Sequence, residues 1–228
     1  MSDNEPQVSQ STPSALDSRN YFDEVAEGWR EKYESSRFFR RRRETILALL
    51  DSCRGPHGRA LDYGCGAGVI SSDLAQRFAA VVAVDRSPAM RQAAQAGLAS
   101  FPNVRVLAPD ELDNTRFDCI LCSSVIEYVQ EDAVFLRILG DLLAPDGKLL
   151  ISFPNRWGPM QMLNRYLLKH LQEKCYARYQ AHVYTKNAIL RLAGEAGLHC
   201  KRVVYEVGIG CLPRFRLSEQ IFVVMGKR

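Results

Sequence analysis

The stretch LDYGCGAGVISSDLA, residues 61–75, decides how the rest of the chain is interpreted. A short apolar strand ends here in three alternating glycines, Gly64, Gly66 and Gly68, and a helical pattern follows over residues 69–78. Glycine tolerates positive φ angles and lets a ligand come close to the backbone. In a parallel sheet, such a turn lies at the carboxyl ends of the strands, where ligands bind. We therefore expect a ligand site at this turn.

Strand and helix patterns alternate on both sides of the turn. Further strands are expected over residues 81–85, 103–107, 117–124, 148–153, 201–207 and 219–226. Helices are expected after the Ser87 cap, over 131–143, and over 185–196, the last one capped by Thr185 and closed by Gly197. This alternation predicts a doubly wound α/β fold with a mostly parallel sheet and helices on both faces.

Composition is typical of a globular protein with one domain. The chain has 228 residues, 46% hydrophobic and 25% charged, with a net charge of +4, too small to indicate a nucleic-acid partner. No apolar run approaches the roughly 20 residues of a membrane span, and the N-terminus lacks a secretory pattern. We expect a cytoplasmic protein with reduced cysteines. Residues 1–17 are expected to be a disordered tail, and 18–228 a domain that begins with helices over 18–57.

Cys119 and Cys122 form a C-x-x-C pair inside the buried strand expected over residues 117–124. Residues three apart on a strand point to opposite faces. The two thiols should not converge on a metal, and we expect two small buried side chains. The four histidines are scattered, and no metal site is expected.

The helices before the sheet carry aromatic and basic residues. The first is expected to place Tyr21, Val25 and Trp29 on one face. The second, over residues 38–50, contains four consecutive arginines, of which Arg40–Arg42 are expected to face away from the apolar stripe. A solvated face is the favoured interpretation, and a patch for phosphate or an acidic partner is the alternative.

Two ligand classes fit the glycine turn: a dinucleotide and S-adenosylmethionine. The dinucleotide fingerprint has its third glycine three positions after the second, where this chain has Val69. A pyrophosphate would also lie close to the negative charge of Asp62. S-adenosylmethionine instead carries a sulfonium and an ammonium, which a carboxylate attracts. Asp85, at the end of strand 81–85, can accept ribose hydroxyls in either class and does not discriminate.

Four motifs occur in the order LDYGCGAG, VVAVDRSPAM, FDCILCSSVIEYV and LLAPDGKLLISFPN. As a set they resemble the motifs of class I, Rossmann-like S-adenosylmethionine-dependent methyltransferases. Within that family the chain is most similar to the small-molecule O-methyltransferase group that includes ubiquinone-biosynthesis enzymes. The resemblance covers about residues 18–228. It implies seven strands in the order 3-2-1-4-5-7-6 with the last one antiparallel, and N-terminal helices that cover the cofactor.

The resemblance also implies which residues bind the methyl donor. They are Asp62, Gly64, Cys65 and Gly66 for its methionyl part, Asp85 for its ribose, Arg86 and Met90 for its adenosine, Asp110 for its adenine amine, and Ser123 with Ser124 beside its sulfonium and the acceptor. Ala108 stands where the family more commonly has the acid that faces the adenine amine.

Methyl transfer from a sulfonium is an in-line displacement in which positioning the acceptor does most of the work. A base is needed only where the acceptor must lose a proton. Candidates are His182, Glu127, Tyr128 and Tyr184. In enzymes that the chain resembles, the region of His182 faces the acceptor, although a structural histidine is the alternative. Those relatives often have His at position 128, so Tyr128 departs from their pattern, and Glu127 is either a base or a residue that orients its loop.

Residues 155–180 form a link much longer than the roughly 2–6 residues typical between a strand and a helix. They mix large apolar side chains with arginines and lysines. The favoured interpretation is an added helix that packs its apolar stripe on the core. The hypothesis set against it is a lid-like insertion over the substrate whose residues 157–172 also rest on a membrane surface.

The sequence thus predicts an S-adenosylmethionine-dependent methyltransferase that acts on a small molecule, at oxygen. Transfer to nitrogen, RNA or protein is one alternative, and a non-catalytic scaffold that keeps the fold is another. The sequence does not indicate an oligomeric state.

Overall fold

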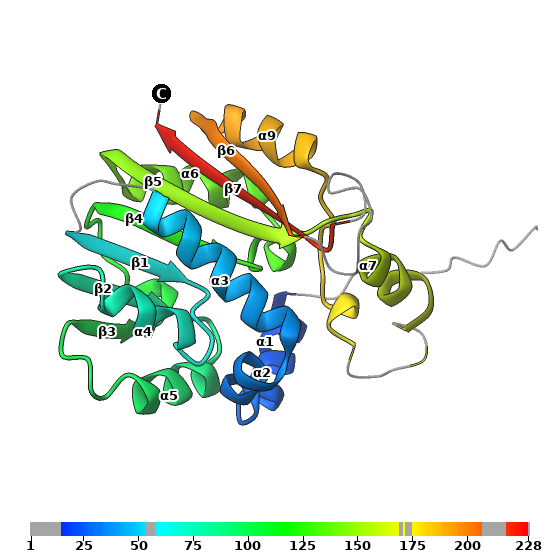
Figure 1. Ribbon diagram of the computed structural model, residues 1–228, viewed down its shortest axis with the longest axis horizontal. Helices are drawn as coiled ribbons and strands as arrows, with labels where there is room; N and C mark the ends of the chain where they lie inside the picture. Colours follow the sequence, from blue (N-terminus) through cyan, green and yellow to red (C-terminus); the bar gives the residue numbers. More distant parts are fainter. Residues whose placement is uncertain (1–14, 53–57, 169–170, 172–174, 207–217, 228) are drawn as a thin grey trace, which may run out of the picture.

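The computed structural model describes residues 15–52, 58–168, 171, 175–206 and 218–227 and contains a seven-stranded sheet in the order β3-β2-β1-β4-β5-β7-β6 (Figure 1). The strands are β1 (Arg59–Tyr63), β2 (Ala80–Val84), β3 (Val104–Leu107), β4 (Phe117–Ser123), β5 (Leu143–Pro154), β6 (Leu198–Glu206) and β7 (Gln220–Lys227). Strands β1 to β5 pair in parallel, and β7 runs antiparallel to both β5 and β6. The expected order and the antiparallel last strand are confirmed.

The main helices are α1 (Ala15–Val25), α2 (Trp29–Ser35), α3 (Arg37–Ser52), α4 (Val69–Ala75), α5 (Pro88–Gly97), α6 (Asp132–Leu142), α7 (Pro159–Leu163) and α9 (Lys186–Glu195). Four single turns are η1 (Pro109–Glu111), η2 (Ile126–Tyr128), η3 (Asn164–Leu168) and η4 (Tyr176–Arg178). The predicted caps are confirmed: Ser87 accepts from the Met90 N–H at 3.0 Å, and Thr185 accepts from the Ala188 N–H at 3.3 Å.

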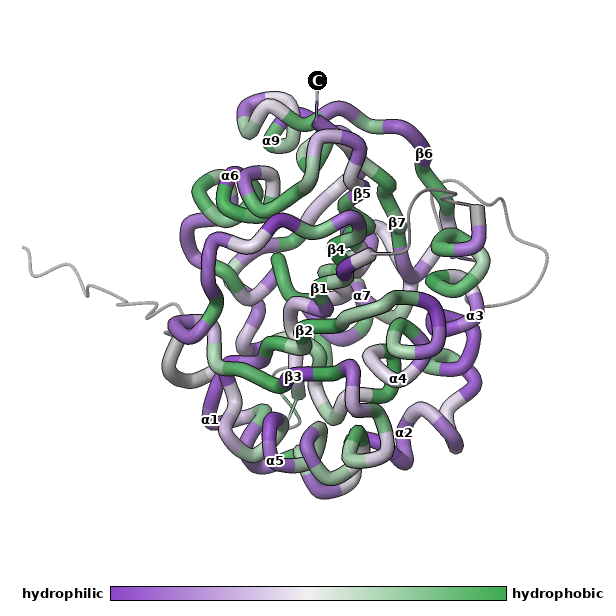
Figure 2. The backbone as a smooth tube through the Cα atoms, turned by 90° about the vertical axis from the view of Figure 1, so that its left-hand side faces the viewer, coloured by the Kyte–Doolittle hydropathy of each residue, from purple (hydrophilic) through white to green (hydrophobic). Residues whose placement is uncertain are grey.

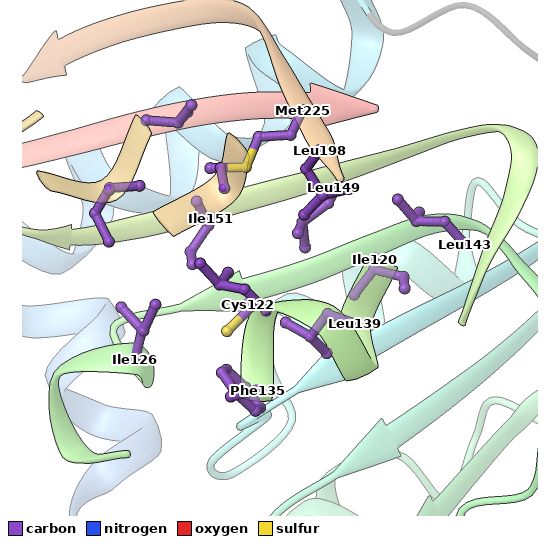
Figure 3. Close-up of a cluster of buried hydrophobic side chains, with 14 of the residues drawn as sticks. Ile120, Cys122, Ile126, Phe135, Leu139, Leu143, Leu149, Ile151, Leu198 and Met225 are labelled. Atoms are coloured by element: carbon purple, nitrogen blue, oxygen red, sulfur yellow. The ribbon is translucent and has the colours of Figure 1, made fainter. Parts of the chain in front are cut away.

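The sheet separates two apolar layers. On one face, Phe135 and Leu139 of α6 pack with Ile151 of β5 (Figure 3). On the other face, Ile46 of α3 and Leu74 of α4 pack against the same sheet. Figure 2 shows mostly hydrophobic central strands and many hydrophilic positions on the surrounding helices. Burial of each such side chain contributes about 1.5–3 kcal/mol to the free energy of folding. Together these side chains hold the strands in place at the edge of the sheet where the site lies.

Cys119 and Cys122 divide between these layers. Both are buried, free thiols. Cys122 belongs to the layer with α6, and Cys119 to the layer with α3 and α4. The prediction that they point to opposite faces of one strand is confirmed.

The N-terminal region forms two helices where the sequence pattern predicts one that continues through Trp29. Helix α1 ends at Val25 and α2 begins at Trp29, with Gly28 in the break. Glycine disfavours helix by about 1 kcal/mol relative to alanine. Helix α1 begins at Ala15, inside the stretch expected to be a tail; residues 1–14 lie outside the described residues.

One arginine of the run expected to face solvent is buried. Arg42 is 7% exposed and donates from Nε to the Ser123 hydroxyl at 3.1 Å and from Nη2 to the Ser123 carbonyl oxygen at 2.9 Å. The expectation is wrong here because Arg42 precedes the buried residues Ile46 and Leu49 by four and seven positions. That spacing puts it on the inward face of α3.

Candidate active site

The glycine turn joins β1 to α4. Gly64, Gly66 and Gly68 have φ angles of +80°, +54° and +74°, a region that strongly favours glycine. A Cβ atom at Gly64 would overlap Val125, and one at Gly66 would lie 2.8 Å from Trp29 Nε1. Conformation and space both exclude side chains, so the turn presents bare backbone.

Asp85 follows β2 and is hydrogen-bonded to the glycine turn. Its Oδ2 accepts from the Gly66 N–H at 2.8 Å, and its Oδ1 accepts from the Ser87 N–H at 2.9 Å. Burial raises the pKa of Asp85, and these two donors act to lower it. Each carboxylate oxygen has a second lone pair, so an oriented Asp85 can still accept from ligand hydroxyls.

A cavity of about 320 Å³ lies against the turn, within the range of roughly 300–1,000 Å³ found for small-molecule pockets. Its walls come from the ends of β1, β2 and β4 and from the N-terminal helices. The predicted site residues that line it are Gly64, Cys65, Gly66, Asp85, Arg86, Met90, Ser123, Ser124 and Tyr128. The structure thus brings together residues that are far apart in sequence.

Asp62 lies behind the turn and is not among the residues that line the cavity. It is 3% exposed, and its Oδ2 accepts from the Ser71 hydroxyl at 2.6 Å. Burial raises its pKa to about 7. Asp62 therefore braces the turn, and the carboxylate that faces the cavity is Asp85.

Asp110 is also outside the cavity lining. It is exposed on η1, and the neighbouring Glu111 accepts from the Ala108 N–H at 2.6 Å. The Glu111 side chain thus caps the backbone of its own turn. Asp110 stays on the surface beside it, and the structure does not bring it to the site.

Aromatic side chains of the N-terminal helices form one wall of the cavity. Phe22 and Trp29 line it, and their ring centroids lie 5.8 Å apart in an edge-to-face contact. Phe22 makes a second edge-to-face contact at 5.2 Å with Tyr128, which follows β4. The N-terminal helices α1 and α2 and the residues that follow β4 therefore contact each other across the cavity.

Two polar contacts hold these helices in place. The Ser87 hydroxyl donates to the Asp23 carboxylate of α1. Arg30 of α2 donates to the carbonyl oxygen of Ala67, inside the glycine turn, at 3.2 Å. Helices α1 and α2 are thus attached to the glycine turn and to the segment at Ser87, the same two segments that donate hydrogen bonds to Asp85.

Arg42 is a lining residue that the sequence interpretation assigned to solvent. It lies beside Ser123, whose hydroxyl oxygen is 2.8 Å from that of Ser152. Its spacing from Ile46 was the signal that could have identified it. A buried guanidinium in this wall places a positive charge beside the end of β4.

Glu127 belongs to η2, next to the cavity-lining Tyr128, but is not itself among the residues that line the cavity. It is 2% exposed, and its Oε2 is buried without a hydrogen-bond partner, an uncommon state for a carboxyl oxygen. Burial raises the pKa of Glu127 to about 8, and the charge of Arg42 acts in the opposite direction. The group is therefore mostly protonated at neutral pH and ionises just above it.

His182 and Tyr184 lie beside this loop without lining the cavity. His182 Nε2 is 3.0 Å from the carbonyl oxygen of Gln130, which does line it. Since a carbonyl only accepts, Nε2 carries the proton in this contact. The Tyr184 hydroxyl donates to Asp132 at 2.9 Å. His182 contacts the rim, and Tyr184 is held in a structural bond.

The lining fits S-adenosylmethionine. Bare backbone at Gly64 and Gly66 admits its methionyl part, the Asp85 carboxylate suits ribose hydroxyls and a cationic ligand, and buried Met90 offers an apolar surface to a base. No group of three His, Cys, Asp or Glu side chains suited to a metal occurs among the described residues.

Comparison with known families defines the class of protein. A family model described as a methyltransferase domain matches residues 31–203. The match covers most of the chain, which therefore belongs to this methyltransferase family. The class predicted from the sequence, a class I S-adenosylmethionine-dependent methyltransferase, is confirmed.

Curated relatives are similar over shorter spans. The chain is 36% identical over 104 residues to the ubiquinone biosynthesis O-methyltransferase of Xanthomonas oryzae pv. oryzae strain PXO99A, covering 43% of this chain and 44% of that protein. It is 28% identical over 165 residues to the mitochondrial ubiquinone biosynthesis O-methyltransferase of Schizosaccharomyces pombe, covering 67% and 60%. The first match spans less than half the length of its relative.

Solved structures share the fold at low identity. The N-methyltransferase NodS of Bradyrhizobium japonicum WM9, in complex with S-adenosyl-L-homocysteine, has a TM-score of 0.69 at 17% identity, with coverage of 91% of this chain and 97% of that one. The magnesium protoporphyrin IX methyltransferase of Synechocystis PCC 6803 has a TM-score of 0.64 at 21% identity, with coverage of 92% and 98%.

Proposed function

We propose that this protein transfers a methyl group from S-adenosylmethionine to an oxygen atom of a small-molecule acceptor. The observation that carries the proposal is the single cavity that joins the glycine turn and Asp85 to Ser123 and Tyr128. The names of the curated relatives, O-methyltransferases, support oxygen as the acceptor atom. Coverage of the cavity by α1 and α2 favours a small acceptor over RNA or protein.

The methyl donor is held by the elements around the turn. The backbone of residues 64–66 holds its methionyl part, Asp85 accepts from its ribose hydroxyls, and Arg86 and Met90 flank its adenosine. S-adenosylmethionine, when bound, supplies a methyl group that its sulfonium has already activated. Asp62 acts indirectly, because it supports the turn from behind.

The acceptor lies toward the end of β4. Tyr128 lines the cavity, and burial raises its pKa well above the ordinary value, so its neutral phenol can orient a hydroxyl by hydrogen bonding. In the fraction of molecules in which Glu127 is ionised, its unpartnered Oε2 takes the proton of that hydroxyl, so the rate should rise as the pH rises toward about 8. His182 positions the loop through Gln130. Arg42 favours the developing negative charge on the acceptor oxygen.

The experiment is transfer of a radiolabelled methyl group from S-adenosylmethionine to a panel of hydroxylated small molecules and their amine counterparts. We expect labelled methyl ethers from a subset of the hydroxyl compounds. Loss of a general base typically reduces the rate about 10²–10⁴-fold, so Glu127→Gln should lower kcat at least about 100-fold while binding of S-adenosylhomocysteine stays within about twofold. Transfer only to amines, or full activity of Glu127→Gln, would contradict the proposal.

A further inference from the structure

Exposed apolar side chains gather on one segment. The described residues include nine large hydrophobic side chains that are exposed, and two of them lie on α6. The other seven lie in one short stretch: Trp157, Met160, Met162, Leu163, Tyr166, Leu167 and Leu171. Figure 1 shows α7 projecting away from the sheet beyond the end of β5. A concentration of this kind on a projecting element marks an interaction surface.

The inward side of this segment is polar. Gln161 and Asn164 are 2% and 6% exposed. Gln161 donates to Gln180 Oε1 at 2.6 Å, and Asn164 donates to the Tyr176 hydroxyl, also at 2.6 Å. The interpretation of a helix that packs its apolar stripe on the core is wrong, because the apolar side chains face outward. Turning them inward would break these buried hydrogen bonds.

Up to residue 172 the charged residues of the segment are all basic, and Glu173 is the first acid after them. Residues 155–172 contain Arg156, Arg165 and Lys169 and no Asp or Glu; Lys169 lies outside the described residues. The Arg156 guanidinium lies 5.7 Å from the centre of the Trp157 ring, and that of Arg165 lies 5.0 Å from the Tyr166 ring. Aromatic rings and arginines side by side on an exposed segment are typical of membrane–water interfaces.

We propose that the face formed by the seven exposed residues between Trp157 and Leu171, the α7 face, docks on the surface of an anionic phospholipid bilayer. Its apolar side chains enter the boundary of the acyl chains, and Arg156 and Arg165 meet the headgroup phosphates. Two arginines beside an apolar patch match such a surface, whereas a second copy of this face would bring like charges together. The contact is independent of the methyl-transfer chemistry.

None of the helices in the described part of the chain has both the length and the apolar character needed to cross a membrane.

Vesicle flotation tests the proposal with the full chain. We expect the protein to float with vesicles of phosphatidylcholine and phosphatidylglycerol at about 7:3, and much less with phosphatidylcholine alone. Tyr166→Ser/Leu167→Ser should lower the partition coefficient at least about tenfold. The matched control is Val134→Ser/Ile138→Ser, which removes exposed apolar side chains from α6 and should float like wild type. Arg156→Gln/Arg165→Gln should abolish the preference for anionic vesicles.

Each variant is first titrated with S-adenosylhomocysteine, and equal affinity shows that the fold is retained. Wild type that stays unbound with both vesicle types overturns the proposal, as does a Tyr166→Ser/Leu167→Ser variant that floats normally. A concentration-dependent dimer in sedimentation velocity, lost in that variant and accompanied by no flotation, assigns the face to a second copy and also overturns it. The readout needs no methyl acceptor, so failure of the proposed function leaves this test intact.

Discussion

Single residues around the site share one electrostatic feature. Burial raises the pKa of Asp62 to about 7, that of Glu127 to about 8 and that of Glu206 to about 7. The charge of Arg42 acts to lower all three values. Arg42 is thus a counter-charge that these three carboxyl groups share, which gives its burial a physical reason.

We expect the free energy of unfolding to fall as the pH rises from about 5 to 8. The ordinary pKa values are 3.8 for Asp62 and 4.5 for Glu127, so the unfolded chain has released protons that the folded state still binds, and stability decreases with pH. Each group contributes up to about 1.4 kcal/mol per pH unit between its two values. Urea unfolding at several pH values measures the slope. Glu127→Gln should reduce it, and stability that rises over this range would contradict the account.

Arg42→Met should lower the free energy of unfolding by about 2–3 kcal/mol. The variant removes the charge-assisted hydrogen bonds from Arg42 to the hydroxyl and carbonyl oxygens of Ser123, a loss typically of that size. It should also raise the pKa of Glu127 further, which extends the pH-dependent loss of stability to higher pH. Arg40 is exposed on the same helix, and Arg40→Met should stay within about 0.5 kcal/mol of wild type. Equal effects of the two substitutions in urea unfolding would show that Arg42 has no special role.

At the scale of the helices, local chemistry could be predicted and long-range contacts could not. The caps at Ser87 and Thr185 follow from residues within one turn, and both were predicted. The inward position of Arg42 follows from its spacing to the apolar residue Ile46, a signal that the sequence interpretation overlooked. The outward α7 face depends on what the rest of the chain packs against. Periodicity identifies a stripe on a helix, but it does not say which way the stripe faces.

Removing residues 1–30 should weaken binding of S-adenosylhomocysteine at least about tenfold. The truncation deletes Phe22, Trp29 and Arg30, and with them the aromatic wall and one of its attachments to the turn. Calorimetry measures the affinity, and circular dichroism shows whether the sheet is retained.

The control for this truncation is removal of residues 1–14, since Ser18 is the first of the described residues that line the cavity. This shorter deletion should leave affinity unchanged. Unchanged affinity after removal of residues 1–30 would mean that α1 and α2 do not act as a cover.

The topology of the whole molecule explains why one cavity collects the site. The sheet reverses its winding between β1 and β4, which are neighbours, and Tyr63 pairs in register with Cys122. Gly64 and Ser123, the next residues, therefore emerge side by side at the carboxyl edge. Ligands of doubly wound folds bind at such a reversal.

Fold class and ligand class were accessible from the sequence for different reasons. Alternating strand and helix patterns predict a parallel sheet, and the spacing after Gly66 disfavours a dinucleotide. The strand order came from resemblance to a family, because local patterns do not encode which strands pair. The sequence does not reveal that Asp62 lies buried behind the turn and Asp110 lies exposed on η1, both outside the cavity lining, since the direction of a side chain depends on local caps and tertiary contacts.

The most direct test of the central claim is calorimetric titration of the purified protein with S-adenosylhomocysteine and, separately, with NAD. We expect binding of the first and none of the second. Asp85→Asn should weaken that binding at least tenfold, about 1.4 kcal/mol, and the matched Asp110→Asn should leave it unchanged. Binding of NAD alone, or binding of S-adenosylhomocysteine that is indifferent to Asp85→Asn, would contradict the assignment of this cavity.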